Sequence, residues 1–304
     1  MTLRYAYNTN GLQSHRLDEA LDLISESGYH GVALTLDHMH LDPLRATPEA
    51  IRQARDWINE RDLEVVIETG ARFVLDPHQK HRPGLCHPDR AARQKRLNLL
   101  KRSLEICSDL GSGLLNLAAG PRDIGRDESE AWPLLEDGLS ELLRRAQTLG
   151  VRVSFEPEPG HWIQSLAGYD HLRSLFPELL LTLDVSHVSV CCDEGTPEEI
   201  VVTHHQHLGL VHLEDAPRGV HAHLPFGEGE LDVSAILREL ETVGFNGLCA
   251  VELSRHSHSA HQIVPDSLNA LKALERELQR SNGSAPSRPQ ISSAQVSNAR
   301  PYGS

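Results

Sequence analysis

Short apolar runs alternate with longer amphipathic stretches along most of the chain. Each run suits a strand that is buried on both faces, and each stretch that follows carries apolar residues at helical spacing. We count eight such units, with strands expected at 4–8, 31–36, 64–69, 113–118, 151–156, 179–184, 208–214 and 248–253. This alternation is typical of a parallel sheet covered by helices.

The expected helices carry their usual boundary signals. Four of them should end at a glycine, which adopts the left-handed conformation of a helix C-cap without strain: Gly28, Gly111, Gly150 and Gly244. Two should begin at a threonine followed by proline, at 47–48 and 196–197, which suits the cap and the first helical position. We therefore predict an α/β fold, a single TIM (β/α)₈ barrel over residues 1–280.

Composition narrows the function classes. The chain has no apolar run of membrane-spanning length and no apolar N-terminal stretch typical of a signal peptide, so we expect a cytoplasmic protein with no membrane partner. Its five cysteines show no CxxC spacing, which indicates neither a disulfide framework nor a thiolate zinc site. A net charge of −14, with only a modest basic run at 90–102, argues against nucleic acid as a partner. Residues 281–304 are polar and rich in serine and proline, so we expect a disordered tail.

Ionisable residues stand at or near the C-terminal ends of the four last strands. The fifth strand ends in Glu156, the sixth in Asp184, the seventh contains His212 and the eighth reaches Glu252. In a TIM barrel these positions face the mouth, where active sites lie. Because converging buried charges are costly without a counter-ion, the pattern predicts a divalent metal bound by these four residues. Three carboxylates and one imidazole favour Mn²⁺ or Co²⁺, with Mg²⁺ or Zn²⁺ as alternatives.

The ligand set leaves an alternative open. A second carboxylate, Glu158, follows the fifth strand in the segment FEPEPG and competes with Glu156 for the ligand position. We prefer Glu156 because it follows the apolar run directly. Any one of the four groups alone could form an ordinary salt bridge, but their repetition at equivalent positions of consecutive strands favours a shared site.

A long loop is expected after the third strand, at 70–87, and it contains Arg72 and Lys80. Long loops at a barrel mouth commonly bind or cover the substrate, although a solvated loop with scattered charge is an equal alternative. Arg72 could bind a substrate phosphate, yet no glycine-rich phosphate cradle accompanies it. The sequence therefore leaves the phosphorylation of the substrate open.

Four motifs resemble the xylose isomerase-like barrel superfamily, and its sugar phosphate isomerase/epimerase branch in particular: LDVSH (183–187), VHLED (211–215), PFGEGELD (225–232) and AVEL (250–253). The resemblance covers about residues 4–278 and implies the same four metal ligands. It further implies that His187 and Arg218 bind the substrate. His221 and His223 stand where the endonuclease IV branch has additional zinc ligands, which leaves a second metal open.

By this resemblance the chain is expected to be a metal-dependent isomerase or epimerase of a keto-sugar or related polyol. The reaction would pass through a metal-stabilised enediolate, with Glu156 and Glu252 as the catalytic acid/base pair. The expected partners are a small sugar substrate and, as in many relatives, further copies of the chain in a homo-oligomer. Three alternatives stay open: a dehydratase or lyase acting on a keto-inositol or 3-keto-glycoside, a DNA-repair nuclease like endonuclease IV, and a non-catalytic metabolite-binding barrel.

Overall fold

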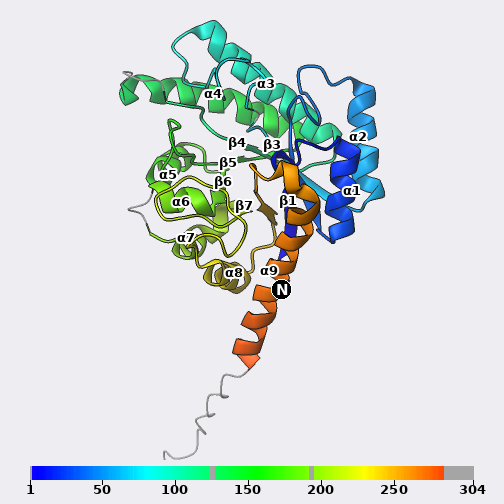
Figure 1. The fold of residues 1–304 in the computed structure, drawn as a ribbon. Coiled ribbons are helices and arrows are strands. Elements are labelled where there is room, and N and C mark those ends of the chain that lie inside the picture. Colours follow the sequence, from blue (N-terminus) through cyan, green and yellow to red (C-terminus); the bar gives the residue numbers. More distant parts are fainter. Residues whose placement is uncertain (1, 71, 123–126, 192–194, 284–304) are drawn as a thin grey trace, which may run out of the picture.

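Eight parallel strands close into a barrel in the computed structural model, which describes residues 2–70, 72–122, 127–191 and 195–283 (Figure 1). Each strand pairs with the next in sequence, and β8 pairs with β1. The strands are β1 (Arg4–Asn8), β2 (Gly31–Thr35), β3 (Glu64–Glu68), β4 (Leu114–Leu117), β5 (Arg152–Phe155), β6 (Leu180–Asp184), β7 (Leu208–Leu213) and β8 (Leu248–Val251). The predicted TIM barrel is confirmed, with every strand within two residues of its expected bounds.

Helices surround the barrel (Figure 1). They are α1 (Leu17–Ser27), α2 (Pro48–Glu60), α3 (Arg90–Asp109), α4 (Glu128–Leu149), α5 (Leu166–Leu175), α6 (Val185–Cys191), α7 (Pro197–His204), α8 (Val233–Thr242) and α9 (Ala260–Gly283), with short 3₁₀ turns η1 (Thr9–Gly11), η2 (His205–His207) and η3 (Ser257–Ser259). Helix α9 includes the first three residues of the expected tail, and residues 284–304 lie outside the described residues. Within the described ranges, no helix combines the length and apolar character needed to cross a membrane.

The predicted helix boundaries are observed. Thr47 accepts a hydrogen bond from the Ala50 amide at 3.2 Å at the start of α2, and Thr196 caps α7. Gly28 ends α1 with a φ of 92°, and Gly150 ends α4 with a φ of 68°, both in the left-handed region. These local signals were readable because capping depends on neighbouring residues alone.

The inside of the barrel changes from apolar to polar along the strands. Residues two apart on a strand face the same side. A small apolar cluster, separate from the main core between strands and helices, contains Ala6, Ala33, Val66, Leu114, Leu210, Leu248 and Ala250. Two residues after six of these stand Asn8, Thr35, Glu68, Asn116, His212 and Glu252. The strands therefore place polar side chains on the inward face at the C-terminal mouth.

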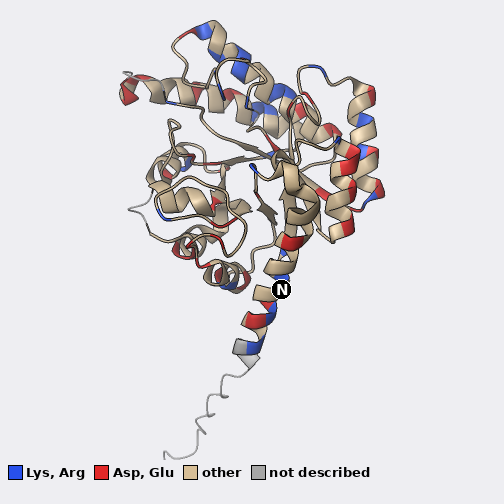
Figure 2. Cartoon of the chain, in the orientation of Figure 1, with Lys and Arg blue, Asp and Glu red and all other residues tan. Residues whose placement is uncertain are grey.

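Acidic and basic residues are interspersed along the outer helices (Figure 2). The basic run that begins α3 is partly paired with acids. Lys101 forms an ion pair with Glu141 of α4, and Arg145 of α4 pairs with Glu105 of α3 at 2.9 Å. Both pairs link α3 to α4, and the first of them involves a cation of the basic run noted in the sequence.

Candidate metal centre at the barrel mouth

The four residues predicted as metal ligands come together at the C-terminal ends of β5 to β8. Glu156 and Glu252 directly follow β5 and β8, Asp184 ends β6, and His212 pairs with Asp184 in the register of β6 and β7. One potential ligand atom from each of the four lies within 4.8 Å of the other three. Four neighbouring strands thus deliver one donor each to a single point.

The contacts within this group suit a cation better than hydrogen bonds. His212 Nδ1 lies 2.8 Å from Glu252 Oε2, 3.4 Å from Glu156 Oε1 and 3.8 Å from Asp184 Oδ2. Yet among the described residues neither His212 Nδ1 nor Asp184 Oδ2 has a hydrogen-bond partner, although both atoms are buried. Buried polar atoms are nearly always satisfied. A divalent ion would satisfy both, so the residues present fit a metal.

A further carboxylate, Glu68 at the end of β3, orients the histidine. It is buried, and its Oε1 lies 2.9 Å from His212 Nε2. If Nε2–H donates to Glu68, the lone pair of Nδ1 faces the three ligand carboxylates. A carboxylate behind the imidazole is the usual arrangement that fixes a metal-binding histidine.

Two asparagines hold the ligand glutamates. Asn116 Nδ2 donates to Glu156 Oε2 at 2.7 Å and also to Glu68 Oε2 at 2.7 Å. Asn10 Nδ2 donates to Glu252 Oε1 at 2.7 Å. Each glutamate therefore has one oxygen held by an amide and the other directed toward His212. The roles of Glu68, Asn116 and Asn10 were not anticipated from the sequence.

The cluster requires a positive charge at its centre. Burial would lower the pKa of His212, but the charges of Glu68, Glu252 and Glu156 outweigh it and raise that pKa well above its usual value. Burial raises the pKa of Glu156 to about 8, although the charge of His212 opposes this. For Glu252, burial is outweighed by His212 and the pKa falls to about 2. Either a proton on His212 or a bound cation can supply the charge.

A cavity of about 260 Å³ lies at the mouth. Glu156, His212 and Glu252 line it, whereas the Asp184 side chain is fully buried. Glu158 also lines this cavity, and its Oε2 lies 3.2 Å from His161 Nδ1. Glu158 is not part of the four-residue group, so the geometry favours Glu156 as the ligand.

Three histidines form a second group beside the first. Ring nitrogens of His187, His221 and His223 lie within 4.8 Å of one another, and a third group joins Asp184, Glu214 and His223. His187 lines the cavity, as expected of a substrate contact, and its Nε2 lies 3.1 Å from His221 Nε2. The second metal that the resemblance leaves open would have its candidate ligands in this group.

Of the basic residues expected at the site, two line the cavity and one does not. Arg72 and Lys80 of the β3–α3 loop line the cavity. Arg218 is exposed in the β7–α8 connection and is not among the residues that line it. The arginine that reaches the cavity from the later strands is Arg255, which follows β8. Substrate binding by Arg218 stays a prediction.

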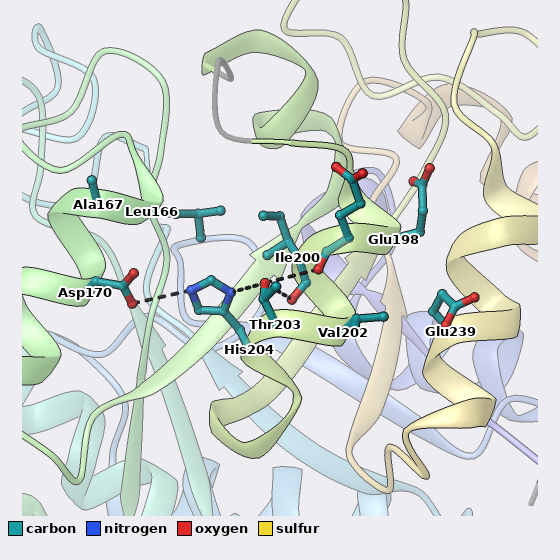
Figure 3. Close-up of a pocket in the computed structure, with 10 residues that line it drawn as sticks. Leu166, Ala167, Asp170, Glu198, Ile200, Val202, Thr203, His204 and Glu239 are labelled. Atoms are coloured by element: carbon teal, nitrogen blue, oxygen red, sulfur yellow. Dashed lines mark hydrogen bonds and ion pairs between the residues drawn. The ribbon is translucent and has the colours of Figure 1, made fainter.

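A larger hollow of about 830 Å³ lies on the outer surface between α5, α7 and α8 (Figure 3). Its wall combines apolar residues with acidic ones, and His204 pairs there with Asp170 at 3.3 Å. None of the three candidate metal-binding groups of the described residues contributes to it. The candidate metal-binding groups therefore lie at the barrel mouth and not at this larger hollow.

Comparison with known proteins agrees with this architecture. A family model described as xylose isomerase-like TIM barrel matches residues 21–274. The chain belongs to this family. The resemblance seen in the sequence motifs is thus confirmed.

Proteins that resemble the chain include sugar epimerases. L-ribulose-5-phosphate 3-epimerase UlaE of Escherichia coli is 25% identical over 244 residues, which cover 77% of this chain and 81% of UlaE. The solved structure of an L-ribulose 3-epimerase superposes with a TM-score of 0.75 at 16% identity, covering 95% of this chain and all of that one. The IOLI protein, solved with a bound zinc atom, has a TM-score of 0.72 at 16% identity, covering 90% and 99%. The two structural similarities show a shared fold.

Proposed function

We propose that the chain is a divalent-metal-dependent epimerase of a keto-sugar. The observation that carries the proposal is the convergence of Glu156, Asp184, His212 and Glu252 on one buried point beside a cavity. The names of UlaE and of the L-ribulose 3-epimerase support it, since both describe inversion at carbon 3 of a ribulose. In a 2-ketose this carbon adjoins the ketone, so its C–H bond is the one that can become acidic.

The four convergent residues would hold the ion. Their donor set suits Mn²⁺ or Co²⁺, with Mg²⁺ and Zn²⁺ as alternatives, and the zinc atom of the IOLI protein supports a divalent ion on this fold. When bound, the ion supplies positive charge that acidifies the C–H bond beside a ketone and stabilises the negative charge left when the proton departs.

Glu156 and Glu252 are the candidates for proton transfer. Their side chains are 12% and 13% exposed, whereas that of Asp184 is fully buried, so these two can reach a substrate. They follow β5 and β8, with β6 and β7 between them. We infer that they flank the bound sugar. One would remove the proton from one face and the other would return a proton to the opposite face, which inverts the carbon.

His187 is proposed to bind a substrate hydroxyl. Its Nδ1 lies 3.0 Å from the carbonyl oxygen of Pro157, and a proton there would be donated to that oxygen. The ring is thereby fixed with Nε2 on the other side, close to His221. Because His187 also lines the cavity, a sugar oxygen can compete with His221 for Nε2.

Proton NMR in deuterated water tests the proposal. The chain, loaded with Mn²⁺ and then freed of excess ion, is incubated with L-ribulose and L-ribulose 5-phosphate. We expect deuterium at carbon 3 together with the carbon-3 epimer. If no exchange at carbon 3 occurred with either ketose, the proposal would be contradicted. Loss of water from either ketose would instead indicate a dehydratase that uses the same C–H acidification.

Two variants and a comparison refine this experiment. Glu156→Gln and Glu252→Gln should each abolish conversion of one epimer into the other, because an amide neither accepts nor returns the proton. Glu158→Gln alters the neighbouring carboxylate outside the four-residue group and should retain most of the epimerisation. If Glu158→Gln abolished epimerisation and Glu156→Gln did not, the acid/base assignment would be wrong.

A further inference from the structure

The cavity at the barrel mouth is lined by side chains of both charges. The carboxylates around His212 form an acidic group. Three basic side chains, Arg72, Lys80 and Arg255, also line the cavity, and we call them the basic rim. Lys101 on α3 and Arg145 on α4 have carboxylate partners, but within the described ranges no ion pair involves a residue of the basic rim. Three cations that form no ion pair among the described residues, beside a cavity of this kind, indicate an anionic ligand.

The β3–α3 loop brings two of these cations together. The His81 amide donates to the carbonyl oxygen of Arg72 at 2.6 Å, so Lys80 is held next to Arg72 although eight positions separate them. This backbone hydrogen bond closes the loop, and both basic side chains line the same cavity.

The end of this loop is anchored on the barrel. The Leu85 amide donates to the carbonyl oxygen of Ala119, just after β4, at 3.1 Å. Gly84 packs against Gly120 so tightly that a Cβ on Gly120 would lie 2.7 Å from Gly84 Cα. The loop thus has a fixed attachment close to the cavity.

Arg255 completes the basic rim from another segment. Its Nη2 donates to the carbonyl oxygen of His221 at 3.4 Å, which connects the β8–α9 segment to the β7–α8 segment. Glu158 also lines the cavity, lies outside the four-residue group and contacts His161. Since the basic rim has three cations and Glu158 contributes at most one negative charge, these four side chains together keep a net positive charge.

We infer that the basic rim binds the phosphate group of a phosphorylated keto-sugar whose ketone end lies over the four convergent residues. This inference rests on the proposed function. A phosphate monoester carries a charge of about −1.5 to −2 and three acceptor oxygens, which suits three cationic side chains. A carboxylate has one charge and two oxygens, and a neutral sugar would leave the cations unpaired. The names of the relatives do not decide the matter, because one acts on a phosphorylated ribulose and the other on ribulose itself.

Steady-state kinetics with matched substrates tests the inference. The wild-type chain should have a kcat/KM for L-ribulose 5-phosphate at least about tenfold above that for L-ribulose. Arg72→Gln, Lys80→Met and Arg255→Gln should each raise the KM for the phosphorylated ketose by about tenfold, with a smaller effect on kcat, because the contact is the same in ground and transition states. Each should change kcat/KM for L-ribulose much less.

Matched controls remove the same charges elsewhere. Lys95→Met lies on the exposed face of α3 and Arg238→Gln on that of α8, and neither residue lines the cavity. Both controls should leave the preference for the phosphorylated ketose intact. If they weakened it as much as the variants of the basic rim do, the effect would reflect overall charge and the inference would be wrong.

A binding measurement separates this inference from the proposed function. Calorimetry compares ribitol 5-phosphate, ribitol and ribonate, which have no ketone to react. We expect ribitol 5-phosphate to bind most tightly and to lose about tenfold in affinity in Arg72→Gln. Equal affinities for ribitol and ribitol 5-phosphate would overturn this inference but not the proposed epimerase function. If ribonate bound as tightly as ribitol 5-phosphate, the group bound by the basic rim would be a carboxylate instead of a phosphate, and the inference would be wrong. Tight phosphate binding without exchange of any ketose would instead overturn the proposed epimerase.

Discussion

Glu68→Gln is the most informative single change at the metal centre. Glu68 does not belong to the four convergent residues, but its two oxygens contact His212 Nε2 at 2.9 Å and Asn116 Nδ2 at 2.7 Å. Glutamine has nearly the same shape but replaces one oxygen by an NH₂ group. It can still accept from His212, yet its amide then faces the amide of Asn116, where two donors meet without an acceptor.

The expected effect follows from these contacts. Asn116 also donates to Glu156, so a displaced Asn116 disturbs one ligand directly while the loss of the Glu68 charge weakens another, His212. Changes in such supporting contacts typically cost about 10- to 100-fold in metal affinity, which is about 1.4 to 2.7 kcal/mol. We expect Glu68→Gln to lose Mn²⁺ affinity in this range while keeping its fold.

Competition of the protein with a fluorescent chelator measures this affinity without reference to activity. The matched control is Glu64→Gln, the same change on the same strand, at an exposed residue that pairs with Arg4 far from the mouth. The control should bind Mn²⁺ like the wild type. An affinity of Glu68→Gln within about twofold of the control would refute the idea that Glu68 supports a metal-binding His212.

Two further predictions concern stability. Burial, followed by the charge of Arg96, lowers the pKa of His161 from 6.5 to about 3, so the unfolded state takes up a proton between these values and stability falls as the pH drops below 6.5. Between about pH 7.5 and pH 5.5, the free energy of unfolding measured in urea should fall by about 1.4 kcal/mol more in the wild type than in His161→Gln. An equal fall in both proteins would contradict this. Gly120→Ala should lower the free energy of unfolding by more than about 1 kcal/mol, because the φ of Gly120 is 92° and the new Cβ would meet Gly84. Gly113→Ala, with open space around the new Cβ, should cost less. Similar urea midpoints for the two variants would contradict this packing.

The fold was predictable because its signals are local and repeated. Apolar runs, capping threonines and terminal glycines each depend on a few neighbouring residues, and together they place all eight strands. The four convergent residues were predictable for a related reason, because ionisable groups at the ends of adjacent strands must meet at the barrel mouth. Glu68 carries the same signal at the end of β3 and could have been found by the same rule.

Other parts of the site depend on contacts between distant segments. Asn10 reaches Glu252 across 242 positions of the chain, through the pairing of β1 with β8. Arg72 and Lys80 meet Arg255 at one cavity only because a long loop closes on itself. The resemblance implies Arg218 as a substrate-binding arginine, and the arginine that lines the cavity from the later strands is Arg255, which no local pattern singled out. Such loop conformations are set by tertiary contacts that no local pattern encodes.

We expect one divalent ion to be bound by Glu156, Asp184, His212 and Glu252 together. Anomalous diffraction from crystals grown with Mn²⁺ locates such an ion. It should show one strong peak within bonding distance of all four side chains, and the peak should be lost in crystals of Asp184→Asn. The absence of a peak at these residues, or a peak bound only to His187, His221 and His223, would contradict this expectation.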